Sequence, residues 1–180
     1  MEYREIIDYW YSKRIQKHWF SSTSELDNEI KKRFEAIWER ALVGELDEWQ
    51  KTPEGCLALI IVLDQFPLNM YRGEAKSFQT ESKAIEVALL AINNDFNKQL
   101  DIDKLLFLYM PFMHSENLEQ QDLSVQLYSE SNLTDNVKFA KHHREIIKRF
   151  GRFPHRNKIL ERKSTLEEDV YLSSEDSFKG

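Results

Sequence analysis

The chain has 180 residues and a net charge of −6, with 31 acidic against 25 basic side chains. A chain of this length normally folds as a single domain whose core needs no disulfide or metal, and the lone Cys56 cannot form an internal disulfide. The acidic balance argues against a general nucleic-acid-binding protein. The first residues lack the apolar segment of a signal peptide and no apolar run reaches about 18 residues, so we expect a cytoplasmic protein without a membrane span.

Glycine and proline are rare and apolar residues recur at helical spacing, which predicts an all-α fold without strands. We expect one helical domain over residues 1–180, with 173–180 as a frayed tail. The predicted helices cover residues 5–12, 26–43, 53–65, 77–93, 102–110, 115–128, 136–150 and 165–172.

The helix over 53–65 is apolar on every side, which is typical of a buried central helix. Thr52 as N-cap and Pro53 at the first helical position mark its start, and Pro67 is expected to stop it. Asp64 and Gln65 therefore lie at a buried helix end. Asn69 and Arg72 follow on the next connection. These polar groups either tie off the helix end or bind a ligand.

A helical wheel for residues 136–150 places His143 on the apolar face with Phe139, Ile146 and Phe150, and His142 on the wetter flank. An inward imidazole needs hydrogen-bond partners, since an unmet buried group costs about 1–3 kcal/mol. A hydrogen-bonded core histidine and a ligand-site histidine both fit this position.

The predicted helix after Pro111 carries Glu116 and Gln120 on one stripe with Leu123 and Leu127, so we expect both polar side chains to turn inward. A buried carboxylate stays ionised only beside a cation or several donors. The window from 138 to 163 supplies them, because it holds ten Lys or Arg against two acids and so carries +8, leaving −14 elsewhere. The candidate partners are Arg149, Arg152, Arg156 and His155.

Three segments, LALIIVLDQFP, YMPFMHSE and FGRFPHRN, resemble a bacterial family known as domain of unknown function 924. The resemblance covers essentially the whole chain and implies a TPR-like array of antiparallel helices, with no settled activity. Two positions depart from the family pattern, which usually has arginine where this chain has Leu68 and glycine where it has Glu161. The first departure implies weaker binding or a different ligand, and the second removes an easy positive-φ position.

The first functional hypothesis is a pocket for an anionic small molecule, a phosphate or carboxylate metabolite. Histidines near neutral pKa would carry protons, oriented by carboxylates. No motif names a reaction or a cofactor, so whether the protein is an enzyme stays open. The candidate catalytic residues are His114, Glu116, His143 and His155. The candidate ligand-binding residues are Asp64, Gln65, Asn69, Arg72, Gln120, Arg149, Arg152, Arg156 and Asn157.

Two alternatives belong to other classes. A metal-dependent enzyme would use His114, Glu116 and His143, but His114 and Glu116 are two residues apart and do not share a helix face. A TPR-like interaction module would bind an acidic peptide or partner protein, its buried polar groups being purely structural. Mutual pairing of the arginines and acids favours the module, whereas a pocket with spare donors favours a ligand site. Nucleic-acid binding ranks low, and the oligomeric state is open.

Overall fold

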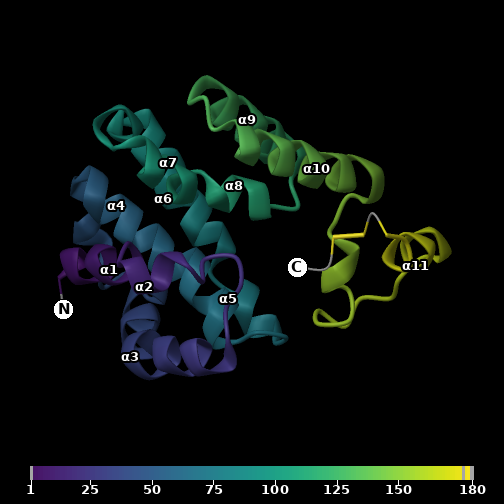
Figure 1. The fold of residues 1–180 in the computed structure, drawn as a ribbon, viewed down its shortest axis with the longest axis horizontal. Helices are drawn as coiled ribbons and strands as arrows, with labels where there is room; N and C mark the ends of the chain where they lie inside the picture. The colour runs from purple at the N-terminus through teal and green to yellow at the C-terminus, as the bar shows by residue number, and fades with distance from the viewer. Residues whose placement is uncertain (1, 176, 179–180) are drawn as a thin grey trace. The chain divides into compact units, whose positions relative to one another are not determined.

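The computed structural model describes residues 2–175, 177 and 178, and within these residues the chain is all-α with no strand. No helix in this part of the chain is long and apolar enough to cross a membrane. The α-helices are α1 (Tyr3–Trp10), α2 (Lys13–Gln16), α3 (Ser24–Leu42), α4 (Pro53–Ile60), α5 (Phe66–Met70), α6 (Glu81–Asn93), α7 (Ile102–Leu108), α8 (Met110–His114), α9 (Leu118–Glu130), α10 (Thr134–Phe150) and α11 (Leu166–Leu172) (Figure 1). Short 3₁₀ turns occupy Asp47–Lys51, Ala75–Phe78, Phe96–Gln99 and Pro154–Arg156, and a π-helical turn occupies Ile61–Gln65.

Contacts divide the chain into two compact units. The first comprises Met1–Arg72 and Lys76–Pro111, and the second comprises Gly73–Ala75 and Phe112–Gly180. The expectation of a single domain over 1–180 stays a prediction.

The first unit is built around α4, as predicted for the apolar run. Thr52 caps this helix by accepting from the backbone N–H of Gly55, with Pro53 in the first turn. The helix packs against α1, α6 and α7. Cys56 is fully buried within it, and burial raises the pKa of its thiol to about 11, which makes it an unreactive core residue.

The prediction that Pro67 stops this helix is wrong. The chain widens into the π-helical turn Ile61–Gln65 and continues as α5 with Pro67 in its first turn. A proline cannot donate to the carbonyl four residues before it, here that of Leu63. The Thr80 hydroxyl donates to this carbonyl instead at 2.5 Å, and it accepts from the Trp38 indole N–H at 3.0 Å. The side chain of the N-cap residue of α6 thus replaces the lost backbone bond.

The second unit consists of the α9–α10 hairpin followed by the short helix α11. Ile146, Ile147, Phe153 and Tyr171 form its apolar cluster. The helix α10 ends at Phe150, as predicted, and Gly151 follows in the left-handed conformation with φ of 70°, its N–H donating to the Ile147 carbonyl.

Two predicted helix faces in this unit are rotated. Phe139 is 59% exposed instead of inward, because the buried stripe of α10 runs through Ala140, His143 and Ile147 and leaves Phe139 at its edge. In α9 the buried stripe runs one residue later than predicted and is centred on Gln121 and Ser124.

The polar residues near these stripes are displaced accordingly. Gln120 is only half-buried, and Glu116 precedes α9, whose N-cap is Asn117. Gln121 turns inward because its amide donates to the carbonyls of Met113 and Ser115.

Two expectations near the C-terminal helix also differ. The sequence Ser164-Thr165-Leu166-Glu167 predicts a capping box between Ser164 and Glu167, but the capping box of α11 joins Thr165 to Glu168. The N-cap is Thr165, and the residue three positions after the N-cap reaches back to it. Residues 173–180 were expected to fray, but the Phe178 N–H donates to the Tyr171 hydroxyl at 2.9 Å and its ring joins the apolar cluster. Residues 176, 179 and 180 of that segment lie outside the described residues.

Candidate functional site

The candidate polar residues of the first unit form hydrogen bonds and an ion pair with other groups of the protein. Asp64 and Gln65 are buried in the π-helical turn, and the Gln65 amide donates to Asp64 at 2.5 Å. Asn69 donates to the Gln65 carbonyl at 2.9 Å. Arg72 donates to both carboxylate oxygens of Asp27, at 2.9 and 3.3 Å. This group therefore stabilises the end of a helix. Its predicted convergence with the polar residues of the second unit stays a prediction.

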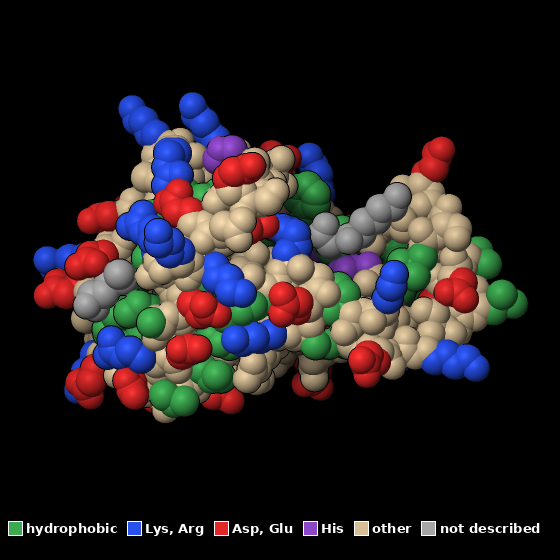
Figure 2. Space-filling view, turned by 90° about the horizontal axis from the view of Figure 1, so that it is seen from below, with side chains coloured by type: hydrophobic (Ala, Val, Ile, Leu, Met, Phe, Trp, Pro, Cys, Tyr) green, Lys and Arg blue, Asp and Glu red, His purple; other side chains and the backbone are tan. Residues whose placement is uncertain are grey.

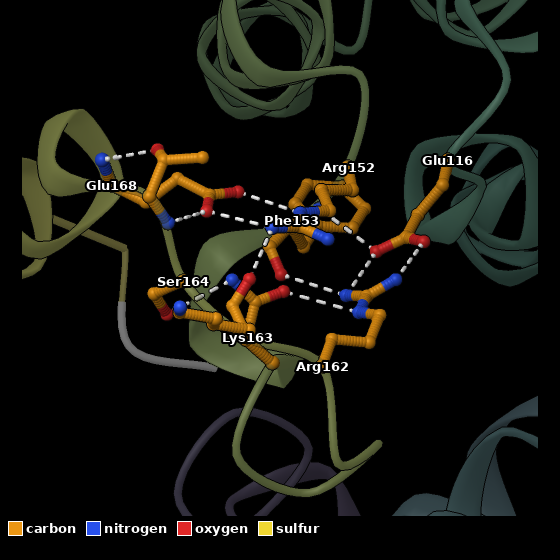
Figure 3. Close-up of polar contacts among 9 residues, drawn as sticks. Glu116, Arg152, Phe153, Arg162, Lys163, Ser164 and Glu168 are labelled. Atoms are coloured by element: carbon orange, nitrogen blue, oxygen red, sulfur yellow. Dashed lines mark hydrogen bonds and ion pairs between the residues drawn. The ribbon is translucent and has the colours of Figure 1, made fainter.

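In the second unit Glu116 receives three hydrogen bonds (Figure 3). Its Oε1 accepts from the backbone N–H of Phe153 at 2.8 Å and from Arg162 at 3.0 Å, and its Oε2 accepts from Arg162 at 2.6 Å. Burial opposes ionisation of this carboxyl, but the hydrogen bonds from Arg162 and Phe153 outweigh it and hold its pKa below the usual range. Arg162 also donates to the carbonyl of Phe153. Both backbone polar groups of Phe153 are therefore held, the N–H by Glu116 and the carbonyl by Arg162.

A second ion pair joins α11 to the segment FGRFPHRN (residues 150–157), which we call the corner. Arg152 donates to both oxygens of Glu168, at 2.6 and 2.8 Å, and to the carbonyl of Lys163. The Arg152 bond, with support from the N–H of Thr165, lowers the pKa of Glu168 to about 2 although the side chain is only 2% exposed. This buried carboxylate is ionised and fully engaged.

The remaining candidate residues of the FGRFPHRN segment also have partners within the protein. Arg156 is buried over the Phe153 ring and donates to the carbonyl of His114 at 2.8 Å. Asn157 accepts from Arg162 at 3.0 Å and donates to Ser164 at 3.1 Å.

Two candidates lie away from this corner. Arg149 forms an exposed pair with Glu167. Gln120 accepts from the Ser115 hydroxyl at 2.5 Å.

Two of the candidate histidines, His143 and His155, are neutral at physiological pH. His143 is 5% exposed, as the wheel predicted, and its Nδ1 donates to the Phe139 carbonyl at 2.8 Å. Burial, with neighbouring histidines adding to it, lowers the pKa of His143 to about 3. Burial followed by the Arg156 cation lowers the pKa of His155 to about 4. Neutral imidazoles held this way are poor proton donors at pH 7.

Within residues 2–175, 177 and 178, no group of three or more His, Cys, Asp or Glu side chains is arranged to hold a metal ion. Glu116, the carboxylate of the predicted metal set, has both oxygens engaged by Arg162. The face drawn in Figure 2 shows basic and acidic side chains interspersed, not gathered by sign.

Sequence reasoning missed the residues that organise this corner, Arg162, Glu168 and the backbone of Phe153. Arg162 had a signal, because it follows directly on one of the two departures from the family pattern. Glu168 had one too, because it lies three residues after the N-cap Thr165.

Comparison with known proteins gives the family. A family model described as "Bacterial protein of unknown function (DUF924)" matches residues 6–176. The chain belongs to this family. A solved structure, the protein of unknown function ATU0120 from Agrobacterium tumefaciens, is similar with a TM-score of 0.90 and 37% identity, over 95% of this chain and 96% of that one. A search of curated proteins finds no match.

The Glu161 departure from the DUF924 pattern has a structural consequence. Glu161 adopts φ of 54°, the left-handed conformation that glycine tolerates best. The N–H of Arg162 donates to the Asn157 carbonyl and that of Glu161 to the Lys158 carbonyl, which is the hydrogen-bond pattern of a Schellman motif with Glu161 at C′. This turn aims Arg162 at Glu116, so the strained glutamate supports the ion pair.

We predict that Glu161→Gly raises the free energy of unfolding by about 1 kcal/mol, because glycine relieves the left-handed strain. Chemical denaturation of both proteins measures the difference. Asn132→Gly is the control: Asn132 also has positive φ, at 56°, but asparagine tolerates it, so the gain is expected to be smaller. Equal gains at both positions would contradict the explanation.

Arg162→Gln is expected to lower the free energy of unfolding by about 2–3 kcal/mol, since it leaves Glu116 without its cation in a half-buried site. The matched control is Arg149→Gln, whose partner Glu167 is exposed and whose loss should change stability by less than about 0.5 kcal/mol. Urea unfolding distinguishes the two. Similar values for both variants would show that the Glu116 pair is not a structural anchor.

Stability is expected to fall as pH falls below 6.5. The pKa of His143 is about 3 in the folded state against the ordinary 6.5, so between these values the unfolded chain binds a proton that the folded chain does not. One such group contributes up to about 1.4 kcal/mol per pH unit. His143→Asn should reduce the slope measured by urea unfolding at pH 7, 6 and 5 by about half, since His155 with its pKa of about 4 contributes the rest. His142→Asn, at the exposed neighbour, should retain the full slope.

Proposed function

We propose that the protein is a helical interaction module that binds a partner protein through the exposed apolar face of α11. The observation that carries the proposal is the orientation of this helix. Glu168 is 2% exposed, whereas Leu166 is 82% and Val170 63% exposed. A surface helix normally buries its apolar residues and exposes its charges. Leu166 and Val170 are four residues apart and so lie on one face.

The orientation of α11 is set by its two buried side chains, Glu168 and Tyr171. The carboxylate is held by Arg152 and by the capping box with Thr165. Rotating the helix to bury Leu166 would break both interactions and leave a carboxylate without its cation. The apolar face therefore stays outward, where a partner can cover it.

The residues beside this face define the partner. Glu167 and Asp169 are exposed, and the Glu167 carboxylate is paired with Arg149. A complementary surface is an apolar groove bordered by lysine or arginine. The acidic peptide suggested by the +8 window is less well supported, because at least six of its ten basic side chains form ion pairs with acids of the chain itself.

The anion pocket remains the competing proposal. It needs guanidinium donors that the protein leaves available to a ligand. Arg72, Arg149 and Arg152 each donate to a carboxylate of the chain. An anion would have to displace these partners, which favours the interaction module.

Site-specific crosslinking in the native host tests the module. A photoreactive amino acid at position 170 is expected to give one discrete adduct, reduced at least tenfold when Leu166→Asp is added. The same group at Val43, which is 70% exposed in the other unit, should give none. Both sites are exposed, so stability should change by less than about 0.5 kcal/mol. Equal crosslinking at 170 and 43, or insensitivity to Leu166→Asp, would refute the proposal.

A further inference from the structure

The second unit contains a cup of three rings, His143, Phe153 and His155, that is filled by the protein's own Phe178. We infer that this cup is a binding site for an aromatic side chain presented on a short peptide, with Phe178 as its internal ligand. The inference does not depend on the exposed face of α11, because neither Leu166 nor Val170 contributes to the cup.

The rings around Phe178 are arranged edge to face. Its centroid lies 4.4 Å from that of His143, at an interplanar angle of 61°, and 5.1 Å from that of His155, at 79°. Phe153 lies against both imidazoles, with centroids 5.6 Å from His143 and 5.5 Å from His155. Edge-to-face packing at these separations favours an aromatic over an aliphatic guest.

The walls of the cup are held by contacts that do not involve Phe178. Phe153 is fixed through both of its backbone polar groups, by Glu116 and Arg162. The His143 ring is oriented by its hydrogen bond to the Phe139 carbonyl. His155 lies within the 3₁₀ turn Pro154–Arg156. A site whose walls are fixed in this way keeps its shape when its occupant leaves.

The occupant, in contrast, is lightly attached. Its N–H donates to the Tyr171 hydroxyl, and the neighbouring Ser177 hydroxyl donates to the Ser174 carbonyl. Ser177 and Phe178 are only half-buried, and half-buried groups open at lower free energy than core helices. A guest in trans competes with an internal ligand whose effective concentration is on the order of millimolar. Removing the Phe178 ring should therefore reveal the site.

The peptide of residues 173–180, SSEDSFKG, serves as the probe, labelled with a fluorophore and titrated by anisotropy. It is expected to bind the full-length Phe178→Ala variant at least tenfold more tightly than the wild-type protein. The peptide SSEDSAKG should bind neither protein. Adding His155→Ala to Phe178→Ala should weaken peptide binding at least tenfold. Phe20→Ala, which removes an exposed phenylalanine of the other unit, should leave binding at the wild-type level.

Equal affinity of the probe for wild type and Phe178→Ala, or no binding to Phe178→Ala, would overturn the inference. Phe178→Leu is a second variant that tests the inference if Phe178→Ala does not fold. Leucine keeps the apolar contact while losing the edge-to-face packing. This variant should bind the peptide more tightly than wild type and less tightly than Phe178→Ala. Affinity equal to wild type in a folded Phe178→Leu protein would also count against an aromatic site.

Discussion

The carboxylate of Glu116 is the constraint on which the second unit depends. A half-buried carboxylate must be ionised and fully hydrogen-bonded or it destabilises the fold. Its partners are a backbone N–H 37 residues away and a guanidinium 46 residues away. The hydrogen bonds of this one side chain thus connect three segments: the connection before α9, the turn after α10 and the residues that precede α11. The cup around Phe178 inherits its fixed wall from the same contacts.

Glu168 has a comparable influence on the surface. An ionised side chain that must be buried beside Arg152 turns inward together with Tyr171, and Leu166 and Val170 are left on the exposed face of α11. The electrostatic requirement outweighs the burial of Leu166 and Val170, each worth about 1.5–3 kcal/mol when fully buried. Arg152, which belongs to the basic segment, therefore contributes to an apolar surface on α11, because it holds the Glu168 carboxylate on the buried side of the helix.

Local patterns in the sequence predicted much of the fold. Apolar spacing indicated the all-α class, the buried helix that begins at Pro53 and the end of another helix at Phe150. The π-helical turn at Ile61–Gln65 could not be predicted, because it depends on Thr80 donating to a carbonyl released by Pro67.

The site was also hard to predict, because it too depends on contacts between residues that are distant in the sequence. The wheel placed His143 correctly but not Phe139, since the partner helix and not the helix itself decides where a buried stripe ends. Glu116 and Arg152 were recognised from sequence, but their partners Arg162 and Glu168 were not, because pairing between distant residues has no periodicity to reveal it.

The separation between Glu116 and Arg162 also has a consequence for how the chain folds. Contacts between residues so far apart form after local helices, because the intervening chain must first be ordered. During synthesis Glu116, α9 and α10 are complete before Arg162 exists. Until Arg162 is made, the carboxylate has no cation in its final position, and water must solvate it. The α9–α10 hairpin is therefore expected to assemble first, with the turn around Phe153 locking last.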